Sequence, residues 1–206
     1  MKYGAVLFDM DGVLIDARDW HYEALNQALK PFDLEISRYD HENEFDGLST
    51  KVKLEKLVLA GKLPKKLVKT IEEIKQDRTL RIAAEKCFPN IAHQILLARL
   101  KKAGLKIGVV TNSIRDSSEF MLKYANVYSL LDTLVTNQDV VNPKPAPDGY
   151  LLGCQNLGFS PKEVLVVEDG EYGIRAARAA GCEVLRVKSP EDVCLSLLST
   201  RIPNLI

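Results

Sequence analysis

The stretch YGAVLFDMDGVLID, residues 3–16, holds the feature from which the fold can be predicted. Residues 3–8 form a nearly continuous apolar run, which is typical of a strand buried on both faces of a parallel sheet. Asp9 and Asp11 follow at once, and Gly12 lets the backbone turn tightly behind them. The stretch therefore predicts a strand whose carboxyl end carries two converging carboxylates.

Similar apolar runs recur along the chain and alternate with helical patterns. They cover residues 106–111, 133–136, 163–167 and 183–187, and glycines end several of the helical segments between them. Strands that alternate with helices predict the α/β class, here a doubly wound parallel sheet forming a Rossmann-like core. In such sheets the functional residues gather at the carboxyl ends of the strands.

Residues 17–88 break this alternation, because they show helical periodicity of apolar residues and no convincing strand. A helical segment placed directly after the first strand is expected to sit over the carboxyl end of the sheet. We therefore expect a core made of residues 1–16 and 89–206, and an inserted all-helical cap domain made of residues 17–88. Such a cap would be able to close on a substrate.

The composition limits the classes of partner. Of 206 residues, 28 are Lys or Arg and 28 are Asp or Glu, so the chain lacks the basic footprint of a nucleic-acid-binding protein. No stretch approaches the roughly 18 apolar residues of a membrane span. The four cysteines show no metal-ligand spacing, and free thiols favour a cytoplasmic protein. The sequence gives no indication of oligomeric state.

Polar clusters follow the other predicted strands. Thr111, Asn112 and Ser113 end the second strand and offer neutral donors for a phosphate oxygen. Lys144 lies among three prolines that stiffen its loop, and residues 168–169 place a carboxylate pair after the fourth strand. Each cluster alone is also compatible with a helix N-cap, a solvated lysine or an acidic surface turn. Four clusters at one edge of one sheet favour a shared site.

The chemistry of that site follows from its charges. Asp9 can attack phosphorus as a nucleophile, and Asp11 can donate a proton to the leaving alkoxide and later accept one from water. Four clustered carboxylates repel one another unless cations lie between them, and Lys144 supplies only one positive charge. Mg²⁺ suits a site with few carboxylates that shares a phosphate oxygen. The sequence thus predicts Mg²⁺ as the cofactor.

The four motifs DxDGV, TNS, KPxP and EDG…GIxAAxxAG, in this order, resemble those of the haloacid dehalogenase superfamily of hydrolases. The early helical insert is similar to that of its β-phosphoglucomutase-like phosphatase subgroup. The resemblance implies that Asp9 is the nucleophile and Asp11 the general acid/base, and that Lys144 bridges phosphate and Asp9. It implies that Thr111 and Asn112 bind phosphate. It further implies a metal site at Asp9, the backbone carbonyl of Asp11, and Asp169, with Glu168 nearby.

The resemblance extends into the cap, at lower specificity. His21 occupies the position of a histidine that helps to gate the general acid in mutase-like relatives, although a half-buried helix histidine is the simpler interpretation. Ser49 lies in a segment similar to the cap specificity loop, and Thr50 and Lys51 stand where the mutases carry an arginine. These four residues are candidate substrate contacts. Lys53 is expected on a solvated helix face.

Together these features predict a Mg²⁺-dependent phosphomonoester hydrolase that acts on small phosphorylated metabolites, such as sugar phosphates, through an aspartyl-phosphate. A β-phosphoglucomutase-type phosphomutase is the alternative enzyme, because it would use the same core residues. A receiver-like phospho-binding domain is a non-enzymatic alternative, and the helical insert and the DxD motif speak against it.

Overall fold

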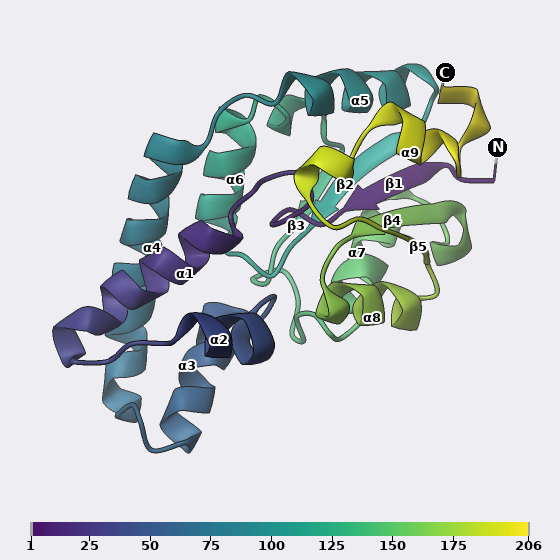
Figure 1. The fold of residues 1–206 in the computed structure, drawn as a ribbon. Helices are drawn as coiled ribbons and strands as arrows, with labels where there is room; N and C mark the ends of the chain where they lie inside the picture. Colours follow the sequence, from purple (N-terminus) through teal and green to yellow (C-terminus); the bar gives the residue numbers. More distant parts are fainter. Residues whose placement is uncertain (1, 206) are drawn as a thin grey trace.

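A computed structural model describes residues 2–205 and contains one parallel sheet flanked by helices (Figure 1). The strands lie in the order β3-β2-β1-β4-β5. Their bounds are Ala5–Phe8 for β1, Lys106–Val110 for β2, Thr133–Val135 for β3, Val164–Glu168 for β4 and Glu183–Arg186 for β5. The five predicted strands are confirmed, and β1, the strand before the DxD motif, is central.

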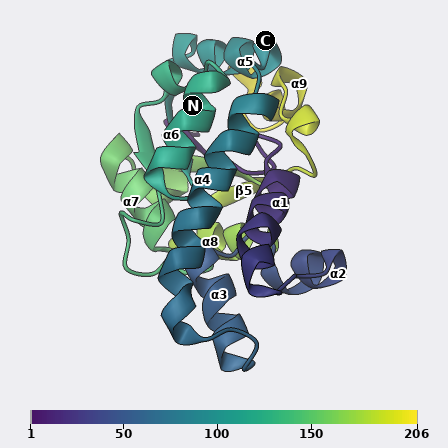
Figure 2. The same cartoon turned by 90° about the vertical axis from the view of Figure 1, so that its left-hand side faces the viewer.

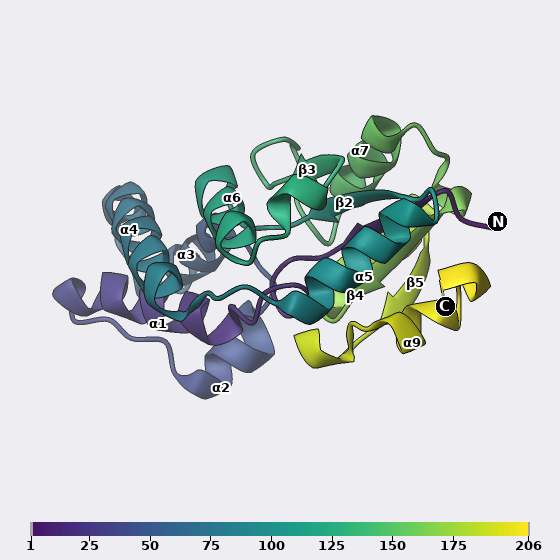
Figure 3. The ribbon, with the colours of Figure 1, turned by 90° about the horizontal axis from the view of Figure 1, so that it is seen from above.

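The apolar runs are continuous because both faces of the sheet are covered. Val6 and Phe8 of β1 pack into one apolar cluster with α5 (Ile91–Lys102), α6 (Arg115–Tyr124) and α9 (Leu195–Ser199). Ala5 and Leu7 point to the other face, against α7 (Asp148–Leu157) and α8 (Glu171–Ala180). Figure 1 shows α5 and α9 above the sheet and α7 and α8 below it, and Figure 3, seen from above, shows α5 lying over the strands.

The segment from residue 17 to residue 88, between β1 and α5, is helical throughout its regular structure, as expected. It contains α1 (Arg18–Leu29), α2 (Arg38–Asp40), α3 (Thr50–Leu59) and α4 (Val68–Lys86). Helices α1 and α4 pack side by side, and α3 lies at their far end (Figure 2). The insert buries its own apolar cluster, which includes Leu25, Leu29, Leu54 and Ile71. These helices therefore have a core that is separate from the two clusters on the sheet.

The register of the sheet aligns the strand ends. Phe8 of β1 lies opposite Val109 of β2 and Val167 of β4, so the residues after these positions emerge at one edge. That edge faces the helical insert. None of the helices within residues 2–205 combines the length and the apolar character needed to cross a bilayer.

Candidate active site

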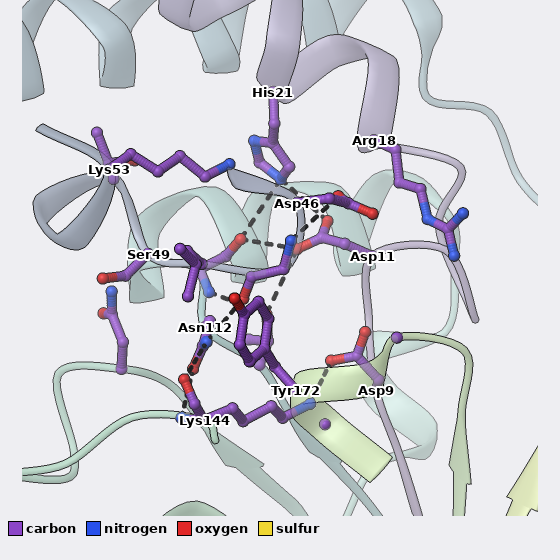
Figure 4. Close-up of a pocket in the computed structure, with 18 of the residues that line it drawn as sticks. Asp9, Asp11, Arg18, His21, Asp46, Ser49, Lys53, Asn112, Lys144 and Tyr172 are labelled. Atoms are coloured by element: carbon purple, nitrogen blue, oxygen red, sulfur yellow. Dashed lines mark hydrogen bonds and ion pairs between the residues drawn. The ribbon is translucent and has the colours of Figure 1, made fainter. Parts of the chain in front are cut away.

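A cavity of about 830 Å³ lies between the carboxyl edge of the sheet and the helical insert (Figure 4). Its wall includes every side chain that the sequence marked as a candidate for chemistry or substrate contact. These are Asp9, Asp11, His21, Ser49, Thr50, Lys51, Thr111, Asn112, Lys144, Glu168 and Asp169. Residues from four strand ends and from the insert therefore meet around one space.

Lys144 links two of the buried carboxylates. Its ammonium group donates to Asp9 Oδ1 at 2.6 Å and to Glu168 Oε1 at 2.7 Å. These two anions raise the pKa of Lys144 although burial opposes the rise. The lysine is therefore held as a cation directly beside Asp9, whose Oδ2 makes no hydrogen bond within residues 2–205.

Both carboxylate oxygens of Glu168 accept hydrogen bonds that hold the side chain in place. Its Oε1 also accepts from the Tyr150 hydroxyl at 3.0 Å, and its Oε2 accepts from the backbone N–H groups of Asp169 and Gly170 at 2.8 and 3.0 Å. A Cβ at position 173 would collide with the Glu168 carboxylate, so Gly173 is needed for this side chain to fit. Glu168 consequently acts as a rigid anchor for Lys144.

Asp11 lies two residues after Asp9 in the sequence, but its carboxylate has different neighbours from those of Asp9. Its Oδ2 accepts from the Ser113 hydroxyl at 2.8 Å, and its Oδ1 lies 3.1 Å from His21 Nε2. On the other side of the ring, Lys75 Nζ lies 3.2 Å from His21 Nδ1. Because an ammonium group can only donate, Nδ1 accepts and Nε2–H donates to Asp11. This places a chain of hydrogen bonds from α4 through α1 to Asp11.

These contacts shift the pKa values of Asp11 and His21. Burial alone would raise the pKa of Asp11, but the electrostatic interaction and hydrogen bond with His21 and the hydrogen bond from Ser113 hold that pKa below its usual value. Burial and the Lys75 charge lower the pKa of His21. His21 is half-buried on α1, as the simpler interpretation expects, and its ring also contacts Asp11 directly.

A group of oxygen ligands suited to a metal ion lies beside this network. One carboxylate oxygen each of Asp9, Glu168 and Asp169 falls within 4.8 Å of the others, and all three residues are buried. Burial raises the pKa of Asp9 to about 7, and Glu168 and Asp11 add to the rise while Lys144 opposes it. The site thus has more negative than positive charge. An all-oxygen, buried and anionic donor set fits a hard divalent cation.

Two features at this group were not foreseen. Arg18, on the first turn of α1, forms an ion pair with Asp169. A Cβ at position 12 would collide with the Asp169 carboxylate and with the Arg18 guanidinium, so Gly12 supplies room for both groups. The Asp11 carboxylate lies outside this group of candidate metal-ligand oxygens because it is turned toward His21 and Ser113.

Asn112 and Thr111 occupy the end of β2. The Asn112 side chain accepts from Lys144 N at 3.0 Å and donates to Lys144 O at 3.1 Å, and it also donates to Gly47 O of the insert at 2.9 Å. Thr111 Oγ1 accepts from Ser113 N at 3.0 Å. Helix α6 is capped at Ile114, so neither Asn112 nor Ser113 serves as its N-cap. Asn112 positions the Lys144 loop and docks the insert.

Ser49, Thr50 and Lys51 reach the cavity from the start of α3. The Ser49 hydroxyl accepts from Val52 N at 3.4 Å and is therefore a helix cap. Lys51 is exposed, whereas Lys53, expected on the solvated face, is only 6% exposed and lines the cavity. That expectation was wrong.

Two buried lysines are the main residues that sequence reasoning missed. Lys53 precedes buried Leu57 by four residues, and Lys75 follows buried Ile71 by four, so both lie on the buried face of their helices. This periodicity could have identified them. Burial lowers the pKa of Lys53 and of Lys75 to about 8. The charge of Lys53 lowers the pKa of Lys75 further. Asp11 opposes the lowering at both lysines, and Asp46 opposes it at Lys53.

The depressed pKa of Lys53 predicts a measurable cost to folding. A fall from 10.5 to about 8 means that the protonated lysine destabilises the fold by about 3 kcal/mol at neutral pH. Between pH 8 and 10.5 the unfolded chain binds more protons than the folded chain, so the penalty fades as pH rises. Lys53→Met should raise the free energy of unfolding by about 1–3 kcal/mol at pH 7, and the gain should shrink toward pH 10.

Denaturant titrations of the native chain and the variant at both pH values measure this difference. Lys51→Met is the matched control, because Lys51 lies on the same helix and is exposed. It should change the free energy of unfolding by no more than about 0.5 kcal/mol. A loss of stability in Lys53→Met at pH 7 would contradict the account.

Comparisons with known proteins agree with this site. The chain matches the model of the haloacid dehalogenase-like hydrolases over residues 6–187. Hexitol phosphatase A of Escherichia coli (strain K12) is 30% identical, over 93% of this chain and 86% of that protein. β-Phosphoglucomutase of Bacillus subtilis (strain 168) is 28% identical, over 86% and 80%. The fold of β-phosphoglucomutase from Clostridium difficile matches with a TM-score of 0.85 at 21% identity, covering 98% and 97% of the two chains. The resemblance inferred from the four motifs is confirmed, and the chain belongs to the haloacid dehalogenase-like hydrolase family.

Proposed function

We propose that this hydrolase is a Mg²⁺-dependent phosphatase that cleaves small phosphate monoesters through a phosphorylated Asp9. The observation that carries the proposal is the buried Asp9 carboxylate, which has one oxygen on the Lys144 ammonium group and the other free of hydrogen bonds within residues 2–205. A carboxylate held in this way is oriented for attack. Lys144 also lies where it would neutralise charge on the phosphoryl group in transfer.

In the first step Asp9 Oδ2 attacks phosphorus. The new bond joins this oxygen to phosphorus as the bond from phosphorus to the ester oxygen breaks. The ester oxygen leaves as an alkoxide that takes a proton from the carboxyl group of Asp11. In the second step Asp11 removes a proton from water, the water oxygen attacks phosphorus, and Asp9 is released with inorganic phosphate.

Asp11 has the contacts that this proton transfer requires. In the arrangement seen here the hydrogen bonds of His21 and Ser113 favour its ionised form, which is the form that activates water. The first step needs the protonated form. His21 directs Nε2–H at Asp11 and accepts at Nδ1 from the Lys75 ammonium group, so it is placed to relay a proton. Asp11 takes the Nε2 proton while Lys75 supplies one to Nδ1, before the ester bond breaks.

Mg²⁺ would be held by Asp9 and Asp169, with Glu168 beside them, since their oxygens form the buried anionic group described above. When bound, the ion supplies positive charge that lowers the pKa of Asp9 and draws electron density from the phosphoryl oxygens. Thr111 would contribute its hydroxyl and Asn112 its backbone N–H as neutral donors to the phosphate, as their family motif implies, since the Asn112 side chain is already engaged by Lys144 and Gly47.

We further propose that residues 17–88 act as a cap over the reacting atoms. The cap meets the core at Asn112, which donates to Gly47 O at 2.9 Å, and at His21, which contacts Asp11. Closure of this kind excludes bulk water from the site. The hydrogen bonds of Asp11 would therefore depend on the position of the cap.

Water is the proposed acceptor of the phosphoryl group, in preference to a sugar hydroxyl. A phosphomutase has to fix the orientation of a sugar by its distal phosphate, and arginine does so bidentately, while lysine attracts an anion as a point charge without fixing its orientation. Thr50 and Lys51 stand at the loop position concerned, and neither Arg78 nor Arg81 lines the cavity. The guanidinium of Arg18 is already paired with Asp169. Arg175 also lines the cavity, but it belongs to α8 of the core and not to the insert. These features favour the phosphatase over the phosphomutase.

Exchange of Asp11 for asparagine tests the proposed acid. Asp11→Asn should reduce kcat/KM for an alkyl phosphate by a factor of roughly 10²–10⁴, the usual contribution of a general acid. Cleavage of p-nitrophenyl phosphate should fall less, because its leaving group needs no proton. Burst kinetics with both esters measure the first step directly. Equal losses on the two esters would show that Asp11 is not the acid.

Removal of divalent cations tests whether the reaction requires a metal ion. Activity should disappear in excess EDTA and return with Mg²⁺, because the buried carboxylates outnumber the cations around them. Ca²⁺ should inhibit, since its larger and looser ligand shell misplaces the attacking carboxylate. Isothermal calorimetry of Mg²⁺ with the native chain and with Asp169→Asn provides a second readout. Full turnover in EDTA, or unchanged Mg²⁺ affinity in the variant, would contradict the assignment.

A further inference from the structure

Two lysine side chains in the cavity wall are buried without the anionic partners that buried cations normally have. Lys53 is 6% exposed and Lys75 is 9% exposed. Within residues 2–205 the Lys53 ammonium group forms no hydrogen bond or ion pair, and Lys75 has only the His21 ring as a partner. Figure 4 shows the end of Lys53 directed into the pocket, on the same side as His21. Buried lysines of purely structural function are normally paired.

The acidic residues of the wall do not fill this role. Asp46, Glu42, Glu72 and Glu73 line the same cavity, but none of them forms an ion pair with either lysine. Glu42 and Glu73 are exposed. Asp11 is already engaged by Ser113 and His21. Two like charges are thus held together on one wall, at a cost to stability that a bound anion would offset.

The position of the lysines separates them from the phosphoryl site. Lys144, Asp9 and the candidate metal-ligand oxygens lie on the core side of the cavity, and Lys144 already has two carboxylate partners. Lys53 and Lys75 belong to α3 and α4 of the insert, on the opposite side. A substrate with its phosphoryl group at Asp9 would therefore extend its other end toward the two ammonium groups.

We infer that Lys53 and Lys75 form a second anion subsite, so that the preferred substrates are small phosphate monoesters with a second anionic group. This inference rests on the proposed phosphatase function and narrows it to a class of substrate. The second group is a carboxylate or another phosphate, because both accept hydrogen bonds from two ammonium groups at once. Esters that end in a hydroxyl group leave both lysines without an anion.

Matched ligands test the subsite. The hydrolysis arm compares 2-phosphoglycolate with 2-hydroxyethyl phosphate, which differ only in the terminal group, and 1,3-propanediol bisphosphate with 3-hydroxypropyl phosphate. The first pair probes a carboxylate and the second pair a phosphate. With the native enzyme and Mg²⁺, kcat/KM should favour the anionic member of at least one pair by roughly 10- to 100-fold. The pair with the larger ratio identifies the source of the anion.

Substitution then assigns the preference to a residue. Lys53→Met, which should fold at least as stably as the native chain, is expected to reduce the ratio to about 3 or less. Lys56→Met is the control, since Lys56 lies on the same helix but is exposed and outside the cavity. It should retain the native ratio. Equal kcat/KM values for both members of both pairs, or a native ratio in Lys53→Met, would overturn the inference.

A binding arm separates this inference from the proposed function. Calorimetry with the non-hydrolysable pair 3-phosphonopropionate and 3-hydroxypropylphosphonate, and with propane-1,3-diphosphonate, requires no turnover. A preference of roughly 10-fold or more for an anionic ligand that disappears in Lys53→Met supports the subsite, even if no ester is hydrolysed. If the binding preference is found but no ester is hydrolysed, the proposed phosphatase function is contradicted and the subsite is not. Equal binding of all three ligands would contradict the subsite.

Discussion

The contact of the Lys144 ammonium group with the Asp9 and Glu168 carboxylates determines how the rest of the site is arranged. All three side chains are buried, and breaking such a network by removing one partner leaves an uncompensated charge. Glu168 is held by the Tyr150 hydroxyl and two backbone N–H groups, and the Lys144 loop is held by Asn112. The Asp9 carboxylate is therefore held by Lys144, and Lys144 and Glu168 are in turn held by further hydrogen bonds of their own.

The fold makes this network possible because it aligns strand ends that are distant in the sequence. Asp9 follows β1, Glu168 ends β4, and the residues after β2 and β3 supply Asn112 and the Lys144 loop. The helical insert then contributes the opposite wall, where His21 meets Asp11 and two lysines face the cavity. The core side is suited to phosphoryl chemistry, and the insert side is suited to recognition of the remainder of the substrate. The two tasks are thus separated in space.

Sequence reasoning identified the core side almost completely. Apolar runs located the five strands, and parallel pairing required the polar residues after them to meet, so Asp9, Lys144 and Glu168 could be grouped without coordinates. The insert was harder, because helix faces depend on how helices pack. Lys53 was expected on a solvated helix face, although its spacing from Leu57 marks a buried position. The Arg18 contact with Asp169 has no local signal, since it depends on the entry angle of α1.

The central claim is that the phosphoryl group passes through Asp9, and chemical trapping tests it most directly. Asp11→Asn should accumulate the aspartyl-phosphate from p-nitrophenyl phosphate, because the base that activates water is lost while attack by Asp9 remains. Reduction of the quenched protein with tritiated borohydride converts an acyl phosphate to the alcohol, and peptide mass mapping locates the label. The account predicts homoserine at position 9 in proportion to the p-nitrophenol released in the burst. Release of p-nitrophenol with label at another residue, or with none, would contradict it.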